Sequence, residues 1–174
     1  MSIENLHKIF NPERVAVIGA SDTPTSVGYT VLRNLIGSGF RGVVYPVNAK
    51  RESVQGIHAY NSVEALPHAP DLAVICTPSR TVPGLVRSLG EIGTRGIVVI
   101  SAGFREIGEE GRELERQLLE EKNRFPGMRI IGPNCLGIIV PGICLNASFA
   151  AATPQKGHIG FISQSGALCT SVLD

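Results

Sequence analysis

The most regular feature of the chain is a series of short, uninterrupted apolar runs separated by longer stretches of mixed polarity. The runs are rich in Val and Ile and cover residues 14–20, 42–48, 71–79, 96–103 and 128–134. Because they are continuously apolar rather than alternating, they are typical of strands buried on both faces of a parallel sheet. Helices are expected between them at 27–37, 62–66, 81–92 and 109–124. The pattern predicts an α/β fold, a parallel sheet with helices on both faces.

The pattern changes after the last of these runs. Residues 141–157 are rich in small residues, Pro and Gly, which is typical of a loop. Residues 158–174 again have the pattern of a strand, a turn and the start of a helix. We therefore expect a first domain at 1–150 and, at 151–174, the first strand and helix of a second, truncated domain.

The stretch between the first apolar run and the first expected helix has the composition of a phosphate-binding turn. Such a turn presents backbone N–H groups at the positive end of a helix dipole, at the carboxyl edge of the sheet. Gly19 permits a tight turn, Ser21 offers a hydroxyl, Ser26 is a candidate helix cap, and Gly28 leaves room for a ligand to approach the helix. The turn is therefore predicted to bind a phosphate.

The residues after the second apolar run restrict which phosphate compound fits. Dinucleotide sites have glycines in the spacing G-x-G-x-x-G, but here eight residues separate Gly19 from the next glycine, Gly28. Such sites also carry an acid after the second strand to bind ribose hydroxyls, whereas this run ends with Asn48, Lys50 and Arg51. A lysine attracts a phosphate where a carboxylate would accept hydroxyl protons. The predicted ligand is an adenosine with an extra phosphate on its ribose, either the 2′-phosphate of NADP or the 3′-phosphate of coenzyme A.

Composition excludes several other classes of function. The formal net charge is +1 and no Lys/Arg block occurs, so the chain is not expected to bind nucleic acid. No apolar stretch approaches the roughly 20 residues that span a bilayer, so we expect no membrane contact and a cytoplasmic protein. The four cysteines are far apart and form no C-x-x-C pair, so no metal site is predicted.

Several motifs, taken together, resemble a known family. In order they read VAVIGAS with SVGYTVLRNL, VYPVNAK, DLAVICTP, VVISAGFREIGEEG, RIIGPNCLG, LNASFA and GFISQSGAL, and they extend over nearly the whole chain. The chain is similar to the CoA-binding domain of the NDP-forming acyl-CoA synthetases, whose superfamily includes the succinyl-CoA synthetase alpha subunit. The resemblance implies a Rossmann-like first domain and the start of a flavodoxin-like, succinyl-CoA-ligase-like second one.

The resemblance also implies roles for the matching residues. The CoA pyrophosphate would be held by Gly19, Ala20, Ser21, Ser26, Val27 and Gly28. The phosphorylated ribose would be held by Asn48 and Lys50, although the family more often has VNPK where this chain has VNAK. Thr77 and Pro78 would border the adenosine. The pantetheine arm and thioester end would lie against Ser101, Ala102, Gly103, Asn134 and Cys135. A further phosphate would bind at Ser163, Ser165 and Gly166.

Complete enzymes of this family convert an acid, CoA and ATP into acyl-CoA, ADP and phosphate through a phosphohistidine. None of the four histidines here matches the phosphorylated position, so we expect no catalytic residue and no turnover by this chain alone. ATP or ADP and Mg²⁺ would bind only through the missing ligase and ATP-grasp parts. Two alternatives remain open: the synthetase-like regulatory region of a protein lysine acetyltransferase, and an NADP-binding oxidoreductase domain.

Overall fold

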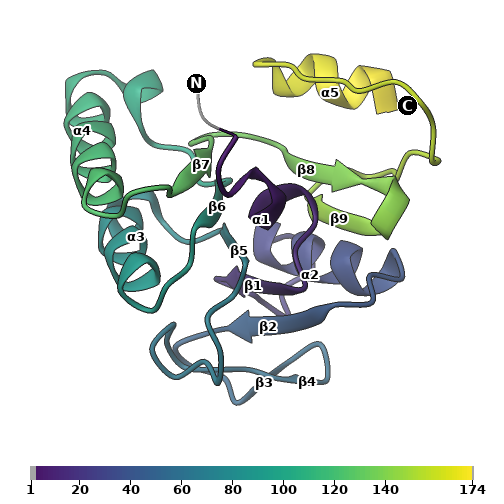
Figure 1. Ribbon diagram of the computed structural model, residues 1–174, viewed down its shortest axis with the longest axis horizontal. Coiled ribbons are helices and arrows are strands. Elements are labelled where there is room, and N and C mark those ends of the chain that lie inside the picture. Colours follow the sequence, from purple (N-terminus) through teal and green to yellow (C-terminus); the bar gives the residue numbers. More distant parts are fainter. Residues whose placement is uncertain (1–2, 174) are drawn as a thin grey trace.

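A five-stranded parallel sheet forms the centre of the computed structural model, which describes residues 3–173 (Figure 1). The strands lie in the order β2-β1-β5-β6-β7, and their bounds are β1 Arg14–Ile18, β2 Val43–Val47, β5 Leu72–Ile75, β6 Gly96–Val99 and β7 Arg129–Ile131. They confirm the five predicted strands. The chain leaves β1 for β2 on one side and returns to β5 on the other, and such a reversal leaves a crevice at the carboxyl ends of β1 and β5.

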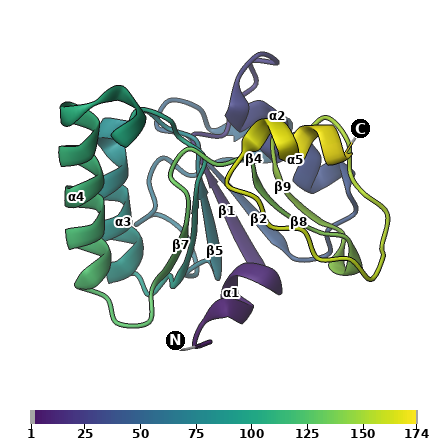
Figure 2. The same cartoon turned by 90° about the horizontal axis from the view of Figure 1, so that it is seen from above.

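Helices cover both faces of the sheet, as predicted. Seen from above, α3 (Val82–Glu91) and α4 (Glu109–Asn123) lie on one face, and α2 (Val27–Gly37) lies on the other (Figure 2). The side chains of the strands alternate between the two resulting cores: Val15 and Val17 belong to the core under α2, while Ile18 belongs to the core under α3 and α4. Each fully buried aliphatic side chain contributes about 1.5–3 kcal/mol through removal from water.

An antiparallel hairpin shares the α2 face of the sheet. Its strands are β8 (Gly137–Val140) and β9 (Leu145–Ser148), joined by the short helix η3 (Pro141–Ile143). Leu145 packs into the core under α2, and the Asn34 side chain of α2 donates hydrogen bonds to the carbonyls of Ser148 and Ala150, both at 2.9 Å. The prediction of a loop over 141–157 was therefore wrong for residues 145–148, because burial against α2 stabilises a strand with little β-propensity of its own.

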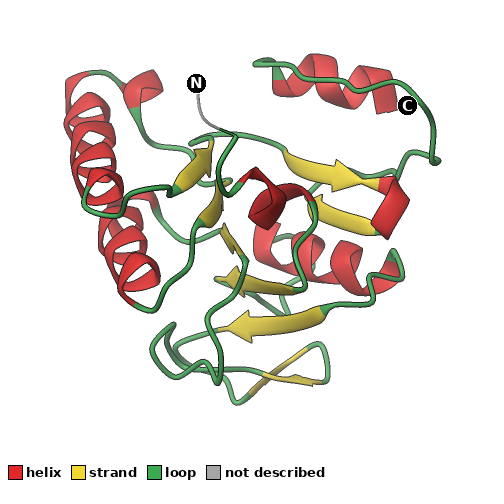
Figure 3. Cartoon of the chain, in the orientation of Figure 1, coloured by secondary structure: helices red, strands yellow, loops and turns green. Residues whose placement is uncertain are grey.

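The connection between β2 and β5 also differs from the prediction. It contains a small hairpin, β3 (Ser53–Val54) with β4 (Ile57–His58), followed by bends and turns (Figure 3). The helix expected at 62–66 is absent from this described segment. Pro67 disfavours a helical backbone at Leu66, and a single turn at Val63 to Leu66 (3.3 Å) is all that forms.

Two further short 3-10 helices and one α-helix complete the domain. The 3-10 helices η1 (Ser79–Thr81) and η2 (Arg105–Ile107) directly precede α3 and α4. The α-helix α1 (Leu6–Phe10) was not predicted; it buries Ile9 in the core under α2, and Lys8 pairs with Asp71 at 2.6 Å.

The last part of the described chain confirms one prediction and contradicts another. The helix expected after residue 165 is α5 (Gly166–Leu173), which lies apart from the sheet in Figure 1 and buries none of its residues. The strand expected near residue 160 does not form, and Ile159 and Ile162 are 94% and 98% exposed. A strand needs a neighbour for its backbone hydrogen bonds, and the described residues provide none here. No helix within residues 3–173 is long and apolar enough to cross a membrane.

Candidate functional site at the carboxyl edge of the sheet

The turn between β1 and α2 lies in the crevice where the strand order reverses. Gly19 has φ +87°, which favours glycine, and a Cβ there would lie 2.9 Å from Cγ2 of Thr77 at the end of β5. The turn therefore packs directly against the neighbouring strand end. This confirms that Gly19 permits a tight turn. The contact also brings the turn after β1 together with the segment after β5 that contains Thr77.

The first two backbone N–H groups of the turn donate to a neighbouring strand, whereas we expected them to face a phosphate. The amides of Gly19 and Ala20 both donate to the Val47 carbonyl, at 3.0 and 3.2 Å, and so they join β1 to β2 instead of facing a ligand. The amides of Val27 and Gly28 are the first two of α2, where no intrahelical acceptor exists. They are the donors that α2 offers to an anion.

The hydroxyls of Ser21 and Ser26 differ in what they can still bind. Oγ of Ser26 accepts from the Tyr29 amide at 3.2 Å and donates to the Thr23 carbonyl at 2.9 Å, which confirms the predicted helix cap. Oγ of Ser21 accepts from the Thr23 amide at 3.0 Å, so its own O–H remains able to donate. Ser21 is therefore the hydroxyl that suits a phosphate.

Gly28 has a packing role that the sequence did not reveal. A Cβ at this position would lie 1.9 Å from the Gly19 carbonyl oxygen and 2.9 Å from its carbonyl carbon. The helix therefore approaches the turn at a distance that only glycine allows. We expected the missing side chain to leave room for a ligand, but the turn itself fills that room.

Asn48 links the end of β2 to the turn between β1 and α2. Its side-chain amide donates to the Ala20 carbonyl at 2.8 Å, its side-chain oxygen accepts from the Lys50 amide at 2.9 Å, and its backbone amide donates to the Tyr60 carbonyl at 2.8 Å. Asn48 thus fixes the relative positions of Ala20 and Lys50. This arrangement indicates a positioning role for Asn48.

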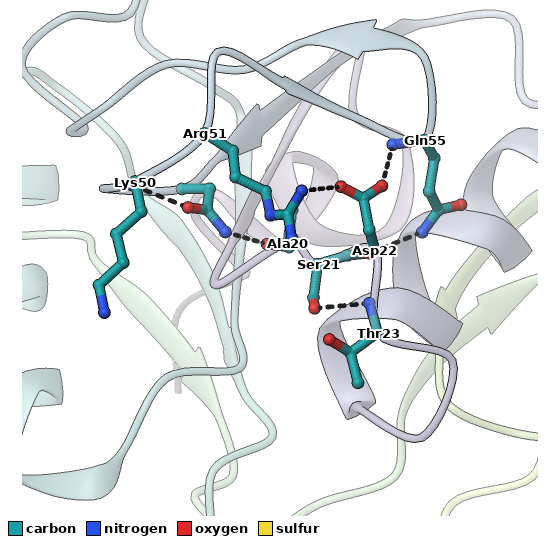
Figure 4. Close-up of polar contacts among 8 residues, drawn as sticks. Ala20, Ser21, Asp22, Thr23, Lys50, Arg51 and Gln55 are labelled. Carbon is teal, nitrogen blue, oxygen red and sulfur yellow. Dashed lines mark hydrogen bonds and ion pairs between the residues drawn. The ribbon is translucent and has the colours of Figure 1, made fainter.

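Lys50 is exposed and borders a hollow of about 390 Å³. Asn48, His58 and Tyr60 also line this hollow, and the Tyr60 ring packs edge-on against His58 with centroids 4.9 Å apart. Figure 4 shows the Lys50 side chain pointing away from Asp22 and Arg51. Its ammonium group is therefore available at the mouth of a recess beside the turn.

The sequence analysis missed Asp22 and Gln55 at the turn, and it named Arg51 without giving it a role. Arg51 pairs with Asp22 at 3.1 Å, and the backbone amide of Gln55 donates to the other Asp22 oxygen at 2.7 Å (Figure 4). The side chain of Gln55 donates to the carbonyls of Ser21 and Tyr29, at 3.1 and 3.0 Å. No local pattern could have revealed these contacts, because the partners in the Gln55 bonds lie 26 to 34 positions apart in the sequence.

The ends of β5 and β6 continue the edge of the sheet beyond the turn. The Ser101 hydroxyl donates to the Thr77 carbonyl at 2.5 Å, so the two strand ends are joined. Pro78 and Gly103 line a second hollow, of about 410 Å³, between the loops that precede α3 and α4 and the first half of α4. Ala102 is exposed beside it. The predicted segments at 77–78 and 101–103 are therefore adjacent.

Asn134 and Cys135 follow β7 at the same edge. The Asn134 amide donates to the Ser101 carbonyl at 3.0 Å, and the Cys135 thiol contacts the Val99 carbonyl at 3.2 Å. Burial raises the pKa of Cys135 to about 11, and burial together with the nearby Cys135 raises the pKa of Cys76 to about 12. Both groups are therefore protonated thiols at neutral pH, unsuited to act as nucleophiles.

Comparison with known proteins identifies the family. A family model described as a CoA binding domain matches residues 13–141, which include all strands from β1 to β8. The chain belongs to the CoA-binding domain family.

The relatives of this CoA-binding domain are parts of ADP-forming synthetases. It is 47% identical to the alpha subunit of acetate–CoA ligase (ADP-forming) II from Pyrococcus furiosus over 97% of the chain and 36% of that subunit. It matches the crystal structure of PH0766 from Pyrococcus horikoshii with a TM-score of 0.91, at 48% identity, over 97% of this chain and 38% of the other. It also matches the structure of a dinucleotide-forming acetyl-coenzyme A synthetase from Ca. Korarchaeum cryptofilum in complex with phosphate and ADP. The TM-score of this match is 0.89 and the sequence identity is 40%, over 97% of this chain and 36% of the other.

These matches decide between the interpretations that the sequence left open. They support the NDP-forming acyl-CoA synthetase family and give no support to an acetyltransferase or an oxidoreductase. The CoA-binding domain spans little more than a third of the length of these relatives.

In the predicted phosphate-binding segment near the end of the chain, the side chains of Ser163 and Ser165 form hydrogen bonds with neighbouring residues of the same segment. Oγ of Ser165 accepts from the Leu168 amide at 3.3 Å, and Oγ of Ser163 accepts from the Ser165 amide at 3.0 Å. Gly166 is the first residue of α5. These hydrogen bonds all stay within the segment and form an ordinary helix cap. Elsewhere in residues 3–173, no group of three His, Cys, Asp or Glu residues is placed to hold a metal ion.

Proposed function

We propose that the carboxyl edge of this sheet binds coenzyme A, and that the chain is the CoA-binding part of an ADP-forming acyl-CoA synthetase. The observation that carries the proposal is a juxtaposition: two unbonded helix amides, the Ser21 hydroxyl and the cationic side chain of Arg51 lie at one turn, and a second cation, Lys50, borders the hollow beside that turn. Membership of the CoA-binding domain family gives the ligand its identity.

The pyrophosphate is assigned to the amino-terminal end of α2. The amides of Val27 and Gly28 point along the helix axis toward the turn, where the helix dipole favours an anion by about 0.3–1 kcal/mol. The Ser21 hydroxyl supplies a third donor, and Ser26 keeps the first turn of α2 in shape. Gly19 and Ala20 contribute the shape of the turn and its attachment to β2.

The phosphorylated ribose is assigned to Lys50, with Asn48 positioning it. Lys50 follows the strand next to the turn and borders the hollow of about 390 Å³. Thr77 and Pro78, which follow β5 on the other side of β1, are proposed to border the adenosine.

The pantetheine arm is assigned to the ends of β6 and β7. Ser101, Ala102 and Gly103 are small, which lets a thin chain pass close to the backbone, and the Asn134 amide links the two strand ends. Cys135 is a neutral thiol there and provides contact without charge.

The activity of the whole enzyme is part of the proposal. Conversion of an acid, CoA and ATP into acyl-CoA, ADP and phosphate would require parts found in the remaining length of the relatives, including those that bind ATP and Mg²⁺. We place the start of a succinyl-CoA-ligase-like domain at 151–174. Ser163, Ser165 and Gly166 at the start of α5 would bind a phosphate in that domain.

A calorimetric titration with three ligands tests the proposed binding. CoA is expected to bind more tightly than 3′-dephospho-CoA by about 1–2 kcal/mol, since a charge-assisted bond to an exposed lysine is partly screened by water. NADP, which has its additional phosphate on the 2′ position, is expected to bind more weakly than CoA. Equal affinities for CoA and dephospho-CoA would remove the role of Lys50, and failure to bind CoA would refute the proposed function.

A further inference from the structure

A carboxylate lies inside the turn that the proposed function assigns to a pyrophosphate. Asp22 directly follows Ser21, and its side chain is 36% exposed. A negative charge at this point opposes the binding of any anion, because like charges repel through a partly solvated site. The residue is not needed for the hydrogen bonds of the Ser26 cap. Its presence at the turn therefore calls for a different physical explanation.

Asp22 is held in place independently of its cationic partner. The Gln55 backbone amide donates to Oδ1 of Asp22 at 2.7 Å, and the Gln55 side chain is itself fixed by the carbonyls of Ser21 and Tyr29. Arg51 contacts the other carboxylate oxygen, Oδ2, at 3.1 Å. If Arg51 moves away, the carboxylate remains at the turn.

Arg51, in contrast, is free to change partners. Its side chain is 58% exposed, and ion pairs this exposed contribute little to stability because water screens them. The CoA pyrophosphate carries two negative charges against the single charge of a carboxylate, and its oxygens can accept two guanidinium N–H groups at once, whereas Asp22 is contacted by one guanidinium nitrogen of Arg51. An anion bound at the turn therefore competes well for Arg51.

Building on the proposed function, we propose that Asp22 is an internal competitor of the CoA pyrophosphate for Arg51. In the free protein Asp22 holds Arg51 beside the turn; on binding, Arg51 transfers to the pyrophosphate and leaves Asp22 unpaired. The assignment is to the pyrophosphate because Arg51 points to the turn, whereas Lys50 points away from it (Figure 4). Asp22 thus lowers the affinity for CoA and favours its release.

The test is a calorimetric double-mutant cycle with CoA, using Asp22→Asn, Arg51→Gln and the double variant. Asparagine keeps the oxygen that accepts from Gln55 but removes the charge. Asp22→Asn is expected to bind CoA roughly fivefold more tightly, and Arg51→Gln to bind it more weakly. The gain from Asp22→Asn is expected to be smaller when Arg51 is replaced, because no competition for the guanidinium remains.

Glu120→Gln is the matched control. It removes a carboxylate that pairs with an arginine, Arg116, on the exposed side of α4, and it should leave CoA affinity unchanged. The gain from Asp22→Asn should shrink when salt is raised from about 50 to about 500 mM, because exposed charges are screened. It should persist with 3′-dephospho-CoA, which keeps the pyrophosphate.

The possible outcomes separate the two proposals. If wild type binds CoA but Asp22→Asn binds it equally or more weakly, Asp22 serves only to order the turn and the competitor role is wrong. If the gain disappears with dephospho-CoA, the partner of Arg51 is not the pyrophosphate and the inference is again wrong. If neither wild type nor any variant binds CoA, the proposed function fails and the inference fails with it.

Discussion

Replacing Gly28 by alanine is expected to destabilise the fold by about 3 kcal/mol or more, at the upper end of the usual cost of overpacking. The added Cβ would lie 1.9 Å from the Gly19 carbonyl oxygen, which is backbone and cannot swing aside as a flexible side chain would. Either α2 moves away from the turn or the turn itself changes shape. Both changes break the packing of α2 on β1 and displace the amides assigned to the pyrophosphate.

Denaturant unfolding followed by circular dichroism measures this effect. Gly37→Ala is the matched control, because Gly37 ends the same helix and a Cβ there meets nothing within 4 Å. The control should be unchanged or more stable by up to about 0.5 kcal/mol, since alanine favours a helix over glycine. Equal stabilities for the two variants would show that the close contact between α2 and the turn is not a feature of the folded protein.

Replacing Lys50 by glutamate is expected to weaken CoA binding by about 2 kcal/mol, roughly thirtyfold, because a charge-assisted bond is lost and a repulsive charge is added. The free energy of unfolding should stay near the wild-type value, since the Lys50 side chain is exposed. Isothermal titration calorimetry with CoA and with 3′-dephospho-CoA measures the effect and identifies the phosphate involved.

The ligand dependence of the Lys50→Glu effect distinguishes a specific contact from a general change in charge. The loss should be large with CoA and small with dephospho-CoA, which lacks the phosphate assigned to Lys50. Arg41→Glu, at the opposite end of β2, makes the same charge change on an exposed residue and should alter neither affinity much. Equal losses with both ligands would place Lys50 away from the 3′-phosphate.

The parallel sheet was predictable because its strands are buried on both faces. A strand such as Leu72–Ile75 reads as a continuous apolar run bounded by turn residues. The two hairpins were not predictable, because the strands β3, β4 and β9 lack such a run. The strands of β3 and β4 have two residues each, and β9 includes Asn146, whose burial is permitted by a hydrogen bond to Thr153 that only the fold provides (2.7 Å).

The meeting of the candidate site's segments at one edge of the sheet was predictable, but the hydrogen bonds that their polar groups make were not. Parallel strands end at one edge, so the segments after β1, β2, β5, β6 and β7 had to meet there. Whether a given donor faces a ligand or another strand depends on contacts between distant residues. The bonds of Gly19 to Val47 and of Asn48 to Ala20 are examples, and so is the Asp22–Arg51 pair.

A crystal structure of the chain with coenzyme A tests the central claim most directly. We predict that the pyrophosphate lies against the amides of Val27 and Gly28, and that the 3′-phosphate lies within hydrogen-bond distance of Nζ of Lys50. A ligand bound elsewhere, or a 3′-phosphate that contacts only water while Lys50 is free, would contradict it.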